Sequence, residues 1–188
     1  MDDVKANRDN RLQLFMFGES NFVPVYSTEE PGTVKMFAPH PVSNREEMRD
    51  QTGYRIRKCL SYDQKQYVSG QAQSTTGCVI FRAVEAYLNY MEAACMKNNG
   101  NVTGKAAEYW RAVRIRAGVD PDFTKTIAAT DLSKENDLAK YKGENEMIDV
   151  TLFNIRRERR CEFIGEGMRW DDLMRWSCLL YTSPSPRD

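Results

Sequence analysis

Apolar residues recur at helical spacing in the second half of the chain. Between residues 79 and 97 they follow at intervals of three or four, through Val84, Met91 and Cys95. This spacing predicts an amphipathic helix, which Asn98-Asn99-Gly100 would end. Polar residues are expected on its other side: Arg82, Glu85, Asn89 and Glu92.

A second helix is predicted over residues 106–117, before Gly118 and Pro121. A short connection between two such helices favours an antiparallel hairpin. Small residues alternate with large aromatic ones along the pair, which lets helices approach closely and resembles tetratricopeptide repeats.

A third helical region, Ile155 to Trp176, threads apolar residues between six arginines and five acids and contains no lysine. Arginine suits two-pronged pairing with carboxylates and stacking on aromatic rings. We therefore predict a packed helix-turn-helix, with its turn at residues 165–167 and an N-terminal cap at Asp149 or Thr151. The expected ion pairs join Arg159 or Arg160 to Glu162 or Glu166, and Arg169 to Asp172.

The remaining segments are predicted to be mostly irregular. Residues 9–12 indicate a polar turn followed by a buried extended piece, and residues 53–59 indicate a strand-like piece. Four prolines interrupt residues 18–51, which predicts a long surface loop. Residues 62–77 and 120–146 are also expected to be loops.

Composition indicates a folded domain without a charge bias. The chain has 188 residues, of which 41% are hydrophobic, and 27 basic residues balance 27 acidic ones. This balance gives no electrostatic case for nucleic-acid binding. No apolar run is long enough to span a membrane, and Met1 does not begin a signal peptide. Five scattered cysteines form no C-x-x-C pair, and Cys78 and Cys95 are expected to pack as small apolar residues.

Catalytic chemistry is not expected. His40 is the single histidine, which disfavours a zinc site or a nucleophilic triad, and no metal or other cofactor is predicted. The acids of residues 158–172 have neighbouring arginines, which lower a carboxylate's pKa and make it a poor general acid.

The order of residues 158–176 resembles the C-terminal signature of the SusD/RagB family. Shorter resemblances cover residues 9–12, 53–58, 81–93 and 109–119, although the usual asparagine of the last motif is replaced. The signature residues are Glu158, Arg159, Arg160, Glu162, Phe163, Gly165, Glu166, Gly167, Arg169, Trp170, Asp172, Leu173, Arg175 and Trp176.

This resemblance implies a mainly α fold of helical hairpins with long irregular loops. Residues 1–176 would be the C-terminal portion of a SusD/RagB-like domain, with the export signal and lipid anchor upstream, outside this sequence. Residues 177–188 resemble nothing in the family, so we expect an unrelated or artefactual tail.

The implied function is binding of a glycan or other nutrient at the surface of the outer membrane. The ligand, such as an oligosaccharide, would pass to a SusC-like TonB-dependent transporter without catalysis. Aromatic rings stack on sugars, so the candidate ligand-binding residues lie in the proline-rich loop; these aromatics could instead fold back over the helices. An alternative function is a cytoplasmic helical-repeat scaffold for protein interactions. The candidate ligand-binding residues are Phe22, Tyr26, Phe37 and His40.

Overall fold

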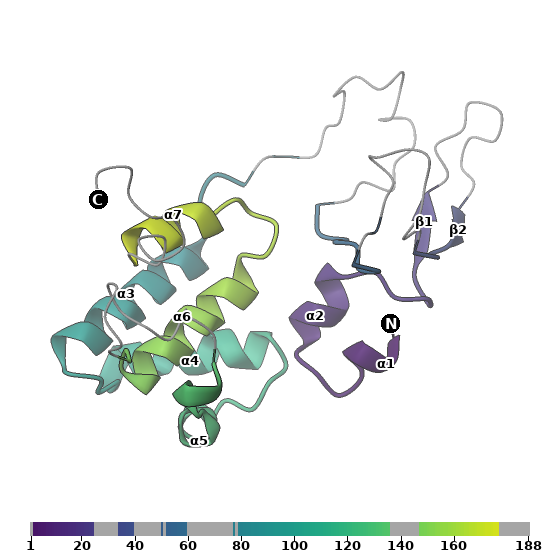
Figure 1. Ribbon diagram of the computed structural model, residues 1–188. Helices are drawn as coiled ribbons and strands as arrows, with labels where there is room; N and C mark the ends of the chain where they lie inside the picture. The colour runs from purple at the N-terminus through teal and green to yellow at the C-terminus, as the bar shows by residue number, and fades with distance from the viewer. Residues whose placement is uncertain are drawn as a thin grey trace, which may run out of the picture. The chain divides into compact units, whose positions relative to one another are not determined.

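The computed structural model describes residues 2–24, 34–39, 50, 52–59, 77, 79–135 and 147–176. The chain divides into two compact units, Met1–Ile80 and Phe81–Asp188 (Figure 1). Helices dominate the described regular structure, and the described strands form one two-stranded sheet. The predicted mainly α fold is confirmed.

Three helices form the centre of the second unit. Helix α3 (Ala83–Lys97) packs against α4 (Gly104–Arg116) and α6 (Val150–Glu162), as Figure 1 shows. The predicted helical hairpin is therefore confirmed, although α3 begins later than the expected residue 79. The core that these helices enclose consists mainly of Val84, Leu88, Met91, Cys95, Ala106, Ala107, Trp110, Val113, Phe123, Leu152, Ile155 and Phe163.

Gly100 closes the hairpin against the start of α6. Its φ of 87° lies in the left-handed region, and a Cβ there would lie 2.7 Å from Asp149 Oδ2. Asp149 in turn caps α6, because its Oδ1 accepts hydrogen bonds from the backbone N–H groups of Thr151 and Leu152 at 2.8 and 3.0 Å. Asp149 is thus the cap, one of the two predicted residues, and glycine is required opposite it.

The prediction of a loop over residues 120–146 is wrong for its first part. Helix α5 (Phe123–Ala129) and the 3₁₀ turn η3 (Leu132–Lys134) occupy it. Phe123 stacks on Trp110 with ring centroids 4.3 Å apart, and Asp122 caps the helix through Thr124 N–H. One buried anchor and a cap define α5, which is too short to show a helical period. Residues 136–146 lie outside the described residues.

The predicted helix-turn-helix near the end of the chain is confirmed. Helix α6 ends at Glu162 and α7 spans Arg169–Arg175. Gly165 and Gly167 both have φ of 77° in the connection, a conformation that side chains with a Cβ rarely adopt.

In the first unit, a helix takes the place of the start of the predicted extended piece. Helix α1 spans Asp2–Lys5, and α2 spans Asn10–Phe15, where an extended segment was expected. Asp9 explains the difference, since its carboxylate accepts from Arg11 N–H and caps α2. The chain becomes extended only at Met16, which pairs with Ile56 and so confirms a strand-like piece there.

A short hairpin follows in the proline-rich region. Strand β1 (Phe22–Pro24) pairs antiparallel with β2 (Val34–Met36), with Phe22 opposite Met36. Residues 18–51 are therefore not irregular throughout. Most of the predicted loop at residues 62–77 lies outside the described residues.

Cysteine placement agrees with the sequence where it is described. Cys95 is buried in the core, and burial, with the nearby charges of Asp149 and Glu92, raises the pKa of its thiol to about 11. Cys78 lies outside the described residues. None of the described helices combines the length and apolarity needed to cross a bilayer.

The stacking of Phe123 on Trp110 is expected to stabilise the helical unit. Phe123→Ala should lower its free energy of unfolding by about 3 kcal/mol, since a large core ring is lost. Ile115→Ala is the control, because Ile115 is 64% exposed on α4. Denaturant unfolding followed by far-UV circular dichroism measures both, and equal effects would contradict the proposed anchor.

Candidate functional site

Glu92 of α3 is buried at the junction of three helices. Its Oε2 accepts from Arg175 Nη2 of α7 at 2.7 Å, and its Oε1 accepts from Trp176 Nε1 at 2.7 Å. Arg156 Nε of α6 lies 3.4 Å from Oε1. One carboxylate therefore ties α3 to both helices of the C-terminal hairpin.

Asp172 plays the same part between α6 and α7. Both of its oxygens accept from Arg159 Nε at 2.8 Å, and Oδ1 also accepts from Arg175 Nε at 2.9 Å. Arg159 Nη1 then donates to Asn89 Oδ1 of α3 at 3.0 Å. Asp172 is 2% exposed and Arg159 4% exposed, so the pair is shielded from water.

Arg82, which precedes α3, ties the start of α3 to the end of α6 and to the turn that follows α6. Its Nε and Nη2 donate to the two oxygens of Glu166 at 2.9 and 2.7 Å, and its Nη1 donates to Glu162 at 2.9 Å. Arg116 Nη2 of α4 lies 2.6 Å from the same Glu162 oxygen. Arg82 also lies over the Phe163 ring, 5.1 Å from its centroid.

The structure changes the predicted partners while keeping the predicted kind of interaction. Arg159 pairs with Asp172, and Arg82, outside this segment, pairs with both Glu162 and Glu166. Arg160 is exposed on α6, and Arg169 lies over the Trp176 ring at 5.7 Å. These arginine–carboxylate pairs extend beyond residues 159–172, because Arg82 takes part in them.

The sequence predicts that Arg82 and Glu92 lie on the polar side of a helix. This prediction is wrong for Glu92, which is buried. The signal for its burial was present, because Glu92 follows Leu88 by four residues and precedes Cys95 by three. It therefore lies on the apolar stripe of α3.

The electrostatics of Glu162 disfavour acid catalysis. Burial acts to raise its pKa, but hydrogen bonds and charge from Arg82 and Arg116 outweigh burial, and the pKa is lowered from the ordinary 4.5. A carboxylate held ionised in this way cannot donate a proton near neutral pH.

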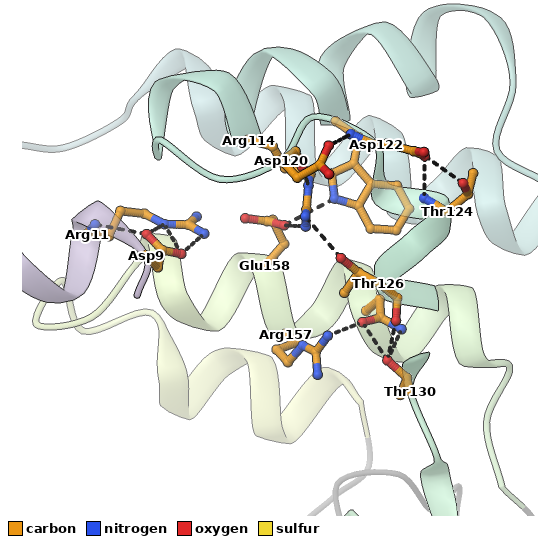
Figure 2. Close-up of polar contacts among 12 residues, drawn as sticks. Asp9, Arg11, Arg114, Asp120, Asp122, Thr124, Thr126, Thr130, Arg157 and Glu158 are labelled. Atoms are coloured by element: carbon orange, nitrogen blue, oxygen red, sulfur yellow. Dashed lines mark hydrogen bonds and ion pairs between the residues drawn. The ribbon is translucent and has the colours of Figure 1, made fainter. Parts of the chain in front are cut away.

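A second buried cluster joins α4, α5 and α6 (Figure 2). Glu158 Oε2 accepts from Trp110 Nε1 at 3.1 Å and lies 3.4 Å from Arg114 Nη1. Arg114 also donates from Nη2 to Thr126 Oγ1 at 3.0 Å. Asn154 Nδ2 of α6 donates to Thr130 Oγ1 at 3.1 Å. These contacts fix α5 against α6.

An open hollow of about 480 Å³ borders this cluster, between α5, η3 and α6. We call it the polar hollow. Its size suits a small ligand, and hydroxyl, carboxylate and cationic groups surround it. Its lining consists of Lys125, Thr126, Ala129, Thr130, Asp131, Lys134, Glu135 and Arg157.

A much smaller hollow of about 20 Å³ lies where α6 meets α7. We call it the arginine hollow. Its volume corresponds to one or two water positions. It is lined by Phe153, Arg156, Arg157, Arg160, Arg169 and Trp176.

The four candidate ligand-binding residues have different placements. Phe22 on β1 is 52% exposed, whereas Phe37 is 3% exposed and stacks on Phe17 with centroids 4.9 Å apart. The burial of Phe37 favours the alternative that such rings cover the interior. Tyr26 and His40 lie outside the described residues. Within the described ranges, no cluster of histidine, cysteine or carboxylate side chains is placed to hold a metal ion.

A family comparison covers almost the whole chain. The family model described as the SusD family matches residues 3–184. The chain belongs to the SusD family. Comparisons with curated proteins and with solved structures give no match. The matched range runs past Trp176, and residues 177–188 lie outside the described residues, so the expectation of an unrelated tail stays a prediction.

Membership of the SusD family indicates nutrient or glycan binding at the cell surface. Members are binding proteins that generally lack catalytic activity. They typically work with SusC-like transporters as outer-membrane surface lipoproteins. The hairpin of α6 and α7 contains residues 158–176, the longest of the stretches by which the sequence resembles the family.

The contacts of Glu92 predict that even a substitution of the same shape at this position destabilises the fold strongly. Glu92→Gln keeps the shape of the side chain but leaves the buried Arg156 without its paired charge, so unfolding should become easier by about 3 kcal/mol. The control Glu108→Gln removes an exposed partner of Lys105 and should leave the unfolding midpoint nearly unchanged. Similar midpoints for the two variants in urea would show that Glu92 does not hold the junction.

The lowered pKa of Glu162 predicts that the folded protein loses stability at acid pH. The unfolded chain binds a proton at about the ordinary 4.5, and the folded chain only at lower pH. The stabilisation is therefore complete above 4.5 and is lost as the pH falls through the folded-state pKa. Glu162→Gln should flatten the loss of stability below pH 4.5, as measured by urea unfolding at stepwise pH. An unchanged slope would exclude Glu162 as a source of this dependence.

Proposed function

We propose that the protein binds a glycan or other nutrient at the outer-membrane surface and passes it to a SusC-like TonB-dependent transporter. The family match over residues 3–184 is the observation that carries this proposal. A lipid anchor outside this sequence would hold the protein at the membrane. We also propose that residues 1–176 are the C-terminal portion of the SusD-like domain.

Capture without bond cleavage fits the geometry of the helical unit. Its buried acids at positions 92, 158, 162 and 172 each lie within ion-pair distance of an arginine. Acids held in this way take part in packing and are shielded from a substrate. The helical unit supplies a rigid body, and ligand contacts fall to its surface and loops.

For ligand contact, the exposed ring of Phe22 on β1 supports a stacking role. We keep Tyr26 and His40 as candidates of the same loop region. For Phe37, stacking on a ligand would require its ring to leave its packed position beside Phe17. A helical-repeat scaffold explains the hairpins equally well, but the family match favours the binding protein.

Binding to a glycan panel, measured by affinity electrophoresis and calorimetry with the intact protein, tests this function. At least one glycan should bind, and chromatography should detect no released product from it. Phe22→Ala should weaken that binding about ten-fold, since one stacking contact is lost. Ile115→Ala serves as the control for an exposed apolar side chain and should leave binding unchanged.

Absence of binding to every glycan and other nutrient tested would contradict the proposal. Product release that persists after repurification would reject its non-catalytic part.

A further inference from the structure

Arg157 of α6 lines both the polar hollow and the arginine hollow. The two hollows therefore share a wall on the helical unit. Arg157 Nη1 lies 3.8 Å from Glu135 Oε1, which is beyond hydrogen-bond length. Its Nη2 donates to Asn154 Oδ1, which restrains the guanidinium group; Figure 2 labels Arg157 and draws this bond.

Side chains of four arginines line the arginine hollow together with Phe153 and Trp176, and no acidic side chain lines it. Arg156 meets Glu92 on the core side. Arg160 lies one helical turn after Arg157, so both side chains leave the same face of α6. Arg160 is exposed, and no ion pair or hydrogen bond among the described residues engages its guanidinium group. The positive charges of Arg157 and Arg160 on this face of α6 favour an anion.

The two volumes restrict what can bind. About 20 Å³ in the arginine hollow accepts one small group and excludes a sugar ring. About 480 Å³ in the polar hollow accepts a ring. Threonine hydroxyls and the charged groups of Lys134 and Asp131 line this larger space and can bond sugar hydroxyls.

We propose that these adjoining hollows bind an acidic sugar, with its carboxylate at Arg157 and Arg160 and its ring in the polar hollow. This inference rests on the proposed glycan-binding function and names the ligand class. Guanidinium groups pair with carboxylates through two parallel hydrogen bonds, which gives them a preference over neutral hydroxyl groups.

Matched sugar pairs test the proposal. Methyl glycosides of galacturonic, glucuronic and mannuronic acid are compared with the corresponding neutral methyl hexosides, which carry CH₂OH in place of the carboxylate. Ligand-observed NMR titrations with the intact protein should show at least one uronate binding about ten-fold more tightly than its neutral partner.

Variants locate the site. Arg160→Gln should weaken uronate binding about ten-fold and leave the circular dichroism spectrum unchanged, because Arg160 is exposed. Arg157→Gln should have a similar effect. Arg8→Gln removes the same charge from an exposed arginine of the other unit and should change nothing.

Equal affinity for acidic and neutral sugars, or undiminished uronate binding by Arg160→Gln, would overturn this inference while leaving glycan binding intact. If acetate bound as tightly as the uronates, the sugar ring would contribute nothing to binding, and the role proposed for the polar hollow would be rejected. If no uronate binds but a neutral glycan does, the inference fails alone; if no glycan binds at all, the proposed function fails with it.

Discussion

A carboxylate buried between helices must meet a positive charge, and this constraint fixes how α3, α6 and α7 pack. Glu92 and Asp172 are 5% and 2% exposed, so unpaired ionised forms would be very costly there. Each acid is shared by two arginines, and Arg175 bridges them. A shift of one helix by a single turn would break several pairs together. We infer that the network specifies the register of the helices more than it adds net stability.

Helix α6 carries arginines with two kinds of role on different sides of its axis. Arg156 and Arg159 pair with acids of α3 and α7, whereas Arg157 lines both hollows and the exposed Arg160 lines the arginine hollow. Four arginines within five residues thus serve two purposes, which the helical period distributes around the axis. The packed side holds the hairpin rigid, and a rigid hairpin presents the remaining cations in a fixed place.

The same arrangement agrees with the generally non-catalytic character of the SusD family. Glu162 is kept ionised by Arg82 and Arg116, although its burial alone would favour the protonated form. Glu158 is engaged by Trp110 and Arg114. Acids engaged in packing are shielded from solvent, and exposed groups such as Phe22 on β1 and Arg160 on α6 are the ones that the proposed ligand would meet.

Sequence alone determined the helical hairpin, the C-terminal helix-turn-helix and the family, and it narrowed the cap of α6 to Asp149 or Thr151, because periodicity, capping and motif order are local properties of the chain. It also indicated that arginines would pair with acids. Only the tertiary structure decided which ones, since Arg82 reaches Glu162 and Glu166 across eighty or more positions of sequence. Helix α5 was missed because its stability comes from Phe123 stacking on Trp110, a contact between two elements. The two hollows likewise arise where separate elements meet, so no spacing within one segment could have revealed them.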